Sequence, residues 1–451
     1  LMSLSSKHNI FLIGIGGIGM SGLAKYFIEK NKNVFGYDRE KSMITIDLTK
    51  MGAKIDYNLE NITEKYNALP KDDTVVVYTP AIPDNHILLN YFTDNNFDIY
   101  KRADILENIS RKSKCIAIAG THGKTTTTSI LAHILKCADV SFTAFVGGIM
   151  ENYNSNFLYN GDEFILVEAD EFDKSFLKLN PDFACITSMD VDHLDIYRNK
   201  ESLSQAFYDF ADNIKFGGLL ITHENLEFNS SKYGERNDSD FKVLNINCKS
   251  ELSIFDFESK KSTIENIKLP LTGHYNVLNA TCAIALALEL GISENQIISS
   301  LISFKGIKRR FSYQIDNENI IYIDDYAHHP EEINKVFDSL KNIYPNDKLT
   351  VIFQPHLYSR TRDLAEDFAT ALSQFDAVIL LEIYPAREIP IKGISSEWLL
   401  EKIDSNHKTI SRKSDISDHI KNIGYRVNIT LGAGDIANEV EHIKQELEYA
   451  Y

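Results

Sequence analysis

The chain has 451 residues, of which 43% are hydrophobic and 25% are charged, and its formal net charge is −17. This length is about three times that of a usual domain, so we expect two or three domains with cores of their own. The balanced composition excludes a wholly disordered or fibrous chain. The excess of negative charge disfavours general binding to nucleic acid.

Three segments each begin with a short apolar strand followed by a helical pattern. This alternation predicts an α/β fold in which mainly parallel sheets are flanked by helices. We place domain boundaries near residues 108 and 313, which gives a Rossmann-like domain 1–107, a P-loop-type domain 108–313 and a Rossmann-like domain 314–451. The predicted strands are 9–13, 34–37, 115–119, 164–167, 184–188, 320–323, 351–353, 377–381 and 427–431. Residues 223–266 are rich in Ser, Asn, Lys and Glu, and we expect hairpins and loops there.

A G-x-G-x-x-G pattern follows the first strand and consists of Gly14, Gly16 and Gly19. Missing β-carbons allow backbone N–H groups to approach a diphosphate at the positive end of the next helix. Asp38 ends the next strand, where a dinucleotide site uses a carboxylate to bind a ribose hydroxyl. Taken alone, the pattern is compatible with an NAD or FAD site of an oxidoreductase, with another nucleotide diphosphate, or with a structural turn.

A second phosphate-binding pattern spans residues 118–126, between a strand and a helix. The strict G-x-x-x-x-G-K-[ST] pattern lacks its first glycine, because Ile stands there. Gly120 and Gly123 still allow the backbone to surround phosphates. Lys124 supplies a charge for the β- and γ-phosphates, and Thr125 supplies a hydroxyl for Mg²⁺. The alternative is a capped helix start with a run of threonines, but the pattern favours ATP.

Acidic residues follow two predicted strands of the central domain. Glu168 closes strand 164–167, and metal–phosphate sites of α/β domains usually lie at the C-terminal ends of strands. His193 stands among aspartates after strand 184–188. It could bind a second Mg²⁺ or cap a turn, and spacing alone leaves both open.

The order and spacing of these motifs resemble the Mur ligase family over almost the whole chain. The segments that carry the resemblance are 14–22 (GIGGIGMSG), 120–126 (GTHGKTT), 168–171 (EADE), 192–195 (DHLD), 276–280 (NVLNA), 309–311 (RRF), 324–330 (DDYAHHP), 354–356 (QPH), 360–363 (RTRD) and 384–386 (YPA). The first of these segments and the paired histidines favour the members that add alanine.

The resemblance implies an ATP-dependent ligase of peptidoglycan precursor synthesis. Its substrates would be UDP-N-acetylmuramate, L-alanine and ATP, with Mg²⁺ as cofactor and an acyl phosphate as intermediate. The first domain would bind the UDP of the sugar without hydride chemistry, the second would bind ATP, and the third would help to bind the amino acid. The nearest alternative is a related ligase that attaches a preformed peptide to the same sugar nucleotide.

The resemblance also assigns roles to individual residues. ATP contacts would come from Gly120, Thr121, His122, Gly123, Lys124, Thr125, Thr126, Asn276, Arg310 and Asp325. Substrate contacts would come from Gly16, Gly17, Ile18, Gly19, Asp38, Thr79, His193, His328 and Arg360. Metal ligands would be Thr125, Glu168 and His193, and catalytic groups would be Lys124, Glu168, Arg310 and His328. Without the resemblance, His328 would be interpreted as a helix-capping or packing residue.

Two residues depart from the family pattern. Tyr275 stands where the family usually has His, and Leu357 stands where it commonly has Arg, which removes a cation from the expected alanine region. We assign no carbamylated lysine, because Lys200 fits that place poorly.

The remaining sequence features concern the setting of the protein. The five cysteines are scattered without a CxxC pair, which disfavours a zinc cluster or a disulfide framework. The apolar runs fall short of the roughly 20 residues that cross a bilayer, and the first ten residues lack the centre of a signal peptide. We expect a cytoplasmic monomer or homodimer whose ligand cleft is locally positive despite the net negative charge.

Overall fold

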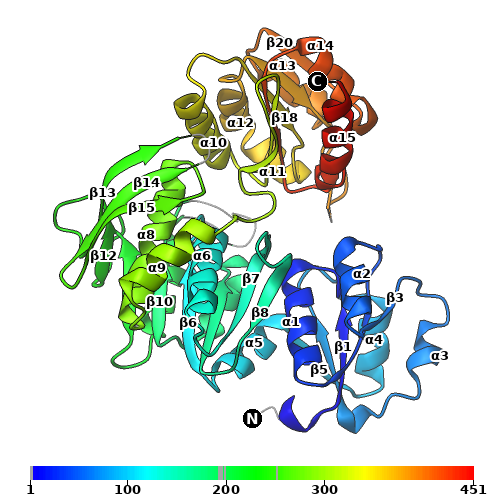
Figure 1. Ribbon diagram of the computed structural model, residues 1–451. Helices are drawn as coiled ribbons and strands as arrows, with labels where there is room; N and C mark the ends of the chain where they lie inside the picture. The colour runs from blue at the N-terminus through cyan, green and yellow to red at the C-terminus, as the bar shows by residue number, and fades with distance from the viewer. Residues whose placement is uncertain (1–3, 191–196, 198–199, 250–251, 387, 451) are drawn as a thin grey trace. The chain divides into compact units, whose positions relative to one another are not determined.

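The computed structural model describes residues 4–190, 197, 200–249, 252–386 and 388–450 (Figure 1). The described residues form two compact units. The first comprises Leu1–Asn247, Ser253–Leu271 and Asn276–Lys305, and the second comprises Cys248–Leu252, Thr272–Tyr275 and Gly306–Tyr451. The first unit contains two β-sheets and the second contains one, and the predicted α/β fold class is confirmed.

The first sheet has five parallel strands in the order β3-β2-β1-β4-β5. Its strands are β1 (Asn9–Ile13), β2 (Asn33–Tyr37), β3 (Lys54–Asp56), β4 (Thr74–Tyr78) and β5 (Asp98–Lys101). Its helices are α1 (Ile18–Glu29), α2 (Met43–Lys50), α3 (Ile62–Tyr66), α4 (Ile87–Asp94) and α5 (Arg102–Ser110), with short 3₁₀ helices η1 (Leu4–Ser6) and η2 (Lys71–Asp73). Because β1 pairs with both β2 and β4, its C-terminal end is a topological switch point, where open α/β sheets bind ligands.

The second sheet has ten strands in the order β15-β14-β13-β12-β11-β10-β6-β9-β7-β8. Its strands are β6 (Lys114–Ala119), β7 (Phe142–Met150), β8 (Ser155–Tyr159), β9 (Phe164–Ala169), β10 (Phe183–Ile186), β11 (Leu219–His223), β12 (Ser231–Gly234), β13 (Phe241–Cys248), β14 (Ser253–Ser259) and β15 (Thr263–Leu269). Its helices are α6 (Lys124–Cys137), α7 (Lys200–Asp212), α8 (His274–Glu289) and α9 (Glu294–Ser303), with the 3₁₀ helix η3 (Phe172–Lys178). The strand β6 pairs in parallel with β10 and β9, so the phosphate loop leaves the middle of the sheet.

The edge of this sheet differs from the sequence prediction for residues 223–266. The antiparallel pair β14–β15 is a hairpin as predicted, but β12 pairs in parallel with both β11 and β13 and so extends the main sheet. Phe241 and Val243 of β13 and Phe255 and Phe257 of β14 are buried. These apolar positions alternate with polar ones on the exposed face, which gives a loop-like composition although the period of two is that of a strand.

The two sheets of the first unit share one hydrophobic core. Phe27 of α1, Phe145 of β7 and Phe157 of β8 belong to the same cluster of buried side chains. Lys25 of α1 donates from Nζ to Asn156 Oδ1 of β8 at 2.9 Å, and burial lowers the pKa of this lysine. The helix that follows the glycine loop is therefore packed against the sheet that carries the phosphate loop, as Figure 1 shows for α1 and β8.

The sheet of the second unit has six strands in the order β16-β17-β21-β18-β19-β20. Its strands are β16 (Ser312–Asp316), β17 (Ile321–Asp325), β18 (Leu349–Phe353), β19 (Ala377–Leu380), β20 (His407–Ile410) and β21 (Val427–Leu431). Its helices are α10 (Pro330–Ile343), α11 (Tyr358–Asp363), α12 (Ala365–Leu372), α13 (Ser396–Lys402), α14 (Ile416–Ile423) and α15 (Val440–Ala450), with 3₁₀ helices η4 (Lys413–Asp415) and η5 (Asp435–Asn438). The pair β16–β17 is antiparallel and the other pairs are parallel. Buried clusters cover both faces, and every residue of the central strands β17, β18 and β21 is buried.

All five cysteines are free thiols. Among the described residues, none of the helices combines the length and the apolar character that a membrane span requires.

Candidate active site

The phosphate loop connects β6 to α6 and is held in place by the residues that follow β10. Thr121 N donates to Ser188 O at 3.1 Å, and His122 N donates to Ser188 Oγ at 2.8 Å. Gly120 has φ +133°, and a β-carbon there would lie 2.9 Å from Ser188 N. Glycine is therefore required at position 120, both for its backbone conformation and for this close approach. The pattern of the loop predicts its glycines, but Ser188 carries no signal in the sequence that identifies it as their support.

Lys124 is the first residue of α6, and its ammonium group is enclosed by the loop. Its Nζ donates to Thr121 O at 3.3 Å, to Gly120 O, and to Glu171 Oε2 at 2.8 Å. Burial opposes the charge of Lys124, but the carboxylates of Glu171 and Asp170 outweigh this effect and raise its pKa. The lysine therefore keeps its proton, as a residue that neutralises phosphate oxygens must.

Glu171 is a site residue to which the sequence assigns no role. Its side chain is fully buried, although an acidic residue after a strand is usually solvated. The signal that could have identified it is its place in the segment after β9, next to the strand that carries Glu168. Glu171 thus pairs with the ammonium group that the loop would offer to phosphate oxygens.

The predicted metal ligands Thr125 and Glu168 lie together. Thr125 Oγ1 donates to Glu168 Oε1 at 2.8 Å, and Gly147 N of β7 donates to Glu168 Oε2 at 2.7 Å. Burial raises the pKa of the Glu168 carboxyl, while Lys124 acts in the opposite direction. A hydroxyl and a carboxylate beside a phosphate loop are the oxygen ligands that Mg²⁺ prefers, so this donor set fits the ion. His193, the third predicted ligand, lies outside the described residues.

Helix α8 supplies two asparagines near the phosphate loop. Asn276, which the resemblance assigns to ATP, is 4% exposed near the start of α8. Asn279 lies one turn further on, and Thr127 Oγ1 of α6 donates to its Oδ1 at 3.4 Å. Gly123 has φ +83°, and a β-carbon on it would meet the side chain of Asn279. Asn279 is therefore a loop contact that the assignment from the sequence missed.

The substrate residues predicted for the first sheet lie on or beside the glycine loop between β1 and α1. Gly16 N donates to Asp38 Oδ2 at 2.8 Å, so this carboxylate supports the loop from the end of β2. Thr79 follows β4, and its Cγ2 would lie 3.6 Å from a β-carbon on Gly14. Gly17 caps α1 and Ile18 is its first residue. The glycine loop therefore places the N-terminal end of α1 at the switch point of the sheet.

Arg102 is a cation beside the glycine loop, and it is not among the site residues predicted from the sequence. It is the first residue of α5, and its Cζ would lie 3.0 Å from a β-carbon on Gly19. Any larger residue at position 19 would displace this guanidinium group. A guanidinium group next to a diphosphate-type loop can form charge-assisted hydrogen bonds to an anionic ligand.

In the second unit, Asp325 at the end of β17 accepts hydrogen bonds from the backbone of two segments, one before and one after it in the chain. Its Oδ2 accepts from Phe311 N at 2.6 Å and its Oδ1 accepts from Ala327 N at 2.7 Å. Burial raises the pKa of Asp325 to about 6, while Arg310 acts in the opposite direction. The guanidinium of Arg310 lies over the ring of Tyr326 at 5.2 Å from its centroid. The predicted ATP residues 310 and 325 are thus brought to one end of β17.

The predicted alanine residues His328 and Arg360 are on neighbouring segments of this unit. His328 Nδ1 lies 3.0 Å from Tyr326 O and 3.3 Å from Glu332 Oε2. Its ring is 6.1 Å from that of His356. Helix α10 is capped by the side chain of the next histidine, at position 329, so capping does not account for His328. Arg360 is on the short helix α11.

Leu357, one of the two departures from the family pattern, is the N-cap residue of α11. It has φ +69°, an uncommon value for a residue with a branched side chain. Its N–H donates to Tyr384 O at 2.9 Å, and the ring of Tyr384 stacks on His356 at 5.6 Å. The strained residue therefore places the aromatic pair and the helix that carries Arg360.

A glycine loop at a switch point, and a phosphate loop with a lysine, a hydroxyl and a carboxylate beside it, are the features of a nucleotide-dependent α/β enzyme. Three family models match the chain: Mur ligase family, catalytic domain, over residues 9–114, Mur ligase middle domain over residues 118–287, and Mur ligase, glutamate ligase domain, over residues 309–436. The chain belongs to the Mur ligase family, as the motifs predict.

Relatives that match the chain over its full length share one name within this family. The chain is 46% identical to the UDP-N-acetylmuramate--L-alanine ligase of Christiangramia forsetii, with 99% of each chain covered. It is also 46% identical to the ligase of the same name from Flavobacterium psychrophilum, with 99% of this chain and 100% of the relative covered. The crystal structure of a UDP-N-acetylmuramate-alanine ligase from Thermotoga maritima matches with a TM-score of 0.82 and 27% identity, over 98% of this chain and 100% of that chain.

Proposed function

We propose that this chain joins L-alanine to the lactyl carboxylate of UDP-N-acetylmuramate and converts ATP to ADP and phosphate. The observation that carries the proposal is the arrangement of Lys124, Thr125 and Glu168 at the phosphate loop. The choice of these substrates is supported by the full-length similarity of the chain to relatives that are named UDP-N-acetylmuramate--L-alanine ligase. We further propose that residues 1–107 bind the sugar nucleotide, 108–313 bind ATP and 314–451 bind the amino acid.

The reaction first needs a better leaving group on the carboxylate. Transfer of the γ-phosphoryl group to a lactyl oxygen gives an acyl phosphate and ADP. Lys124 exchanges Glu171 and the loop carbonyls for phosphate oxygens, and its charge reduces the repulsion between the two anions. Positioning contributes most of the remaining acceleration, because the protein forms no covalent bond in this step.

Thr125 and Glu168 would hold Mg²⁺ beside the phosphates. The bound ion would neutralise charge on the transferring group. The hydrogen bond from Gly147 N keeps the second oxygen of Glu168 in place, so the side chain is oriented from the β7 side before any ion is bound.

The amine of L-alanine then attacks the acyl carbon, and the tetrahedral intermediate collapses with release of phosphate. Before it attacks, the ammonium form must lose a proton. We assign His328 to orienting or deprotonating this amine and Arg360 to binding the alanine carboxylate. Asn276 and Asp325 would contact the adenosine, and Arg310 would contact the phosphates.

Phosphate release with UDP-N-acetylmuramate tests the proposal directly. L-alanine, glycine, L-serine and a preformed tripeptide are offered separately, and we expect release with L-alanine to be fastest. Release with the tripeptide alone would overturn the assignment in favour of a peptide-attaching ligase. Lys124→Ala should abolish release while UDP-N-acetylmuramate binding, measured by calorimetry, stays within about twofold. Retained turnover in that variant would refute the role of the phosphate loop.

The five free thiols support a reducing, cytoplasmic setting for the enzyme. We infer a monomer or a homodimer, which sedimentation analysis of the full chain would distinguish.

A further inference from the structure

Asn156 is a buried residue of β8 whose side-chain hydrogen bonds, among the described residues, go to helix α1. Its Nδ2 donates to Ile18 O at 2.6 Å and to Ser21 Oγ at 3.0 Å, and its Oδ1 accepts from Lys25 Nζ at 2.9 Å. Asn156 is 1% exposed and Ser21 is fully buried, so water does not compete for these bonds. One amide from the sheet that carries the phosphate loop therefore contacts two turns of the helix that follows the glycine loop.

The bond to Ile18 lies at the end of α1 that faces the predicted substrate site. Ile18 is the first residue of the helix and Gly17 is its N-cap. The positive end of a helix binds anions through the free N–H groups of its first turn. A side chain that fixes the carbonyl of Ile18 therefore fixes the direction in which those N–H groups point.

Lys25 carries a buried ammonium group in the second turn of α1. It is 7% exposed, and among the described residues its Nζ donates to two uncharged groups, Asn156 Oδ1 and, at 3.1 Å, Ser155 Oγ. Burial lowers the pKa of Lys25, while Asp47 of α2 acts in the opposite direction. Burying a charge costs stability, and an apolar side chain of the same length avoids that cost. Packing alone therefore does not favour a lysine at this position.

The charge of Lys25 lies close to the start of the helix. The amide of Asn156 joins Lys25 Nζ to Ile18 O, and this path limits the separation of the two atoms to about 8 Å. At this range inside a protein, a positive charge adds to the positive end of the helix dipole. An anion bound at the glycine loop would be attracted by both.

The strand pair β7–β8 connects this contact to the carboxylate beside the phosphate loop. Asn156 precedes Phe157, which pairs with Phe145 of β7. Two residues further along β7, Gly147 N donates to Glu168 Oε2 at 2.7 Å. The same two strands thus contact both α1 and Glu168. A shift of α1 on this sheet would change the separation of the two loops.

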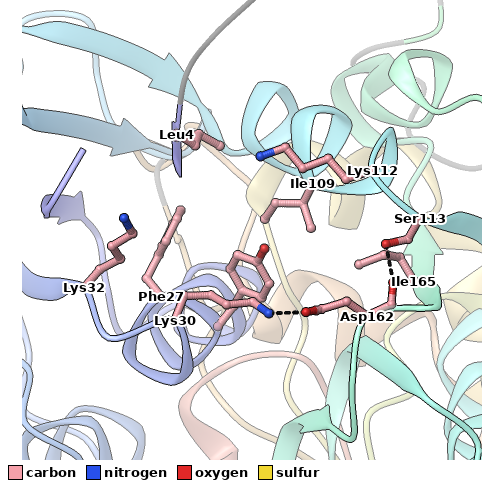
Figure 2. A pocket seen from close by; sticks show the side chains of 10 residues that line it. Leu4, Phe27, Lys30, Lys32, Ile109, Lys112, Ser113, Asp162 and Ile165 are labelled. Atoms are coloured by element: carbon pink, nitrogen blue, oxygen red, sulfur yellow. Dashed lines mark hydrogen bonds and ion pairs between the residues drawn. The ribbon is translucent and has the colours of Figure 1, made fainter. Parts of the chain in front are cut away.

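The opposite end of α1 is attached to the same part of the fold by an exposed contact. Figure 2 shows the ion pair between Lys30, the C-cap residue of α1, and Asp162. The Asp162 side chain is 51% exposed, and exposed ion pairs contribute little to stability. The twelve residues of α1 place this pair about 18 Å from the glycine loop. Lys30 therefore offers a matched comparison with Lys25, because both lysines reach from α1 to β8 or the residues after it.

We propose that Asn156 and Lys25 are positioning residues for the sugar nucleotide. Asn156 holds the first turn of α1 on the sheet that carries the phosphate loop, so that the bound substrate presents its lactyl carboxylate to the γ-phosphate. Lys25 supplies a buried positive charge behind the helix start and strengthens binding of the diphosphate. The inference rests on the proposed function, because it takes the glycine loop as the diphosphate site.

The test measures binding of UDP and of UDP-N-acetylmuramate to the full-length chain by calorimetry, and phosphate release by steady-state kinetics. Lys25→Met keeps the length of the side chain and removes its charge, and it should bind both nucleotides about threefold more weakly. Asn156→Leu/Lys25→Met replaces the whole buried polar contact by apolar groups of similar size, so it should still fold. We expect this double variant to bind both nucleotides about tenfold more weakly and to have a lower kcat, with the KM for ATP within about twofold. If the double variant melts early, Lys25→Met alone decides the result.

The matched control is Lys30→Met, which removes a lysine from the other end of the same helix. It should leave both nucleotide affinities within about twofold. A loss equal to that of Lys25→Met would overturn the inference, because any weakened attachment of α1 would then suffice. Unchanged nucleotide affinity in the Lys25 and Asn156 variants, or an equal rise in the KM for ATP, would also overturn it and leave these residues a structural role only.

The natural chain separates this inference from the function on which it rests. Failure of the natural chain to bind either UDP or UDP-N-acetylmuramate would refute the proposed function, and the inference with it. Binding by the natural chain with equal binding by the variants would refute the inference alone.

Discussion

The variant Glu171→Gln tests the ion pair between Lys124 and Glu171 at the phosphate loop. The substitution keeps the shape of the side chain and removes the charge that lies 2.8 Å from the Lys124 ammonium. At an effective dielectric constant of about 20, a Coulomb interaction at this distance is about 6 kcal/mol before desolvation is counted. Breaking one side of a buried ion pair typically costs about 3–5 kcal/mol. We therefore expect the ligand-free variant to lose about 3 kcal/mol of stability in the first unit.

The same variant should bind ATP more tightly. In the natural chain, phosphate must displace Glu171 from Lys124, whereas in the variant no charged competitor is present. If ATP binding breaks the pair, the stability lost by the free variant is recovered in its ATP complex. Because 1.4 kcal/mol corresponds to a factor of ten, even half of the expected loss would tighten ATP binding by about tenfold.

The assay combines chemical denaturation of the ligand-free protein with calorimetric titration of ATP. The double variant Glu171→Gln/Lys124→Met is the matched control, because it removes both charges and should be more stable than Glu171→Gln alone. A variant that loses stability and also binds ATP less tightly would refute the exchange model, since the pair would then persist in the complex.

Three further predictions concern residues that bind ligands or support the loops. Arg102→Ala should weaken UDP-N-acetylmuramate binding by about tenfold and leave ATP binding unchanged, because the guanidinium lies beside Gly19; equal calorimetric losses for both ligands would contradict this. Arg360→Ala should raise the KM for L-alanine far more than that for ATP in the phosphate-release assay, and parallel increases would remove Arg360 from the alanine site. The pKa of Asp325 is raised to about 6 from 3.8 by burial, so the folded state binds the proton more strongly and the stability contribution of this group falls as pH rises from about 4 to about 6. Denaturation at several pH values should show this fall in the natural chain relative to Asp325→Asn, and identical pH profiles would exclude it.

The sequence predicts the central strands well because they are buried on both faces. β1, β18 and β21 are buried along their whole length and are mostly apolar, and each is followed by a glycine or a polar residue. The strands β12 and β13 escape prediction because polar residues stand among their few buried apolar positions. Their apolar positions can be recognised as core positions only when the elements that pack against these strands are known.

For the site, the sequence predicts the groups whose chemistry lies in a local pattern. Lys124 and Thr125 stand in a loop whose spacing follows from the shape of a phosphate. Glu171, Asn279 and Arg102 reach the two loops from other elements, and such contacts depend on how helices and strands pack. Glu171 has a local signal, its place three residues after Glu168, but the contacts that these three residues make with the loops require the structure.

The ion pair between Lys124 and Glu171 changes the expectation of a simply positive ligand site. Lys124 keeps its proton because the carboxylates of Glu171 and Asp170 favour its charged form, and its ion pair with Glu171 balances its charge at the loop. A phosphate ligand that replaces Glu171 at the ammonium group would leave that carboxylate to be neutralised, and a Mg²⁺ ion held, as we propose, by Thr125 and Glu168 would be a cation that could do so. Tight ATP binding should therefore depend on Mg²⁺ more strongly in the natural chain than in Glu171→Gln. Equal dependence on Mg²⁺ in calorimetric titrations of the two proteins would show that the carboxylate takes no part in this charge balance.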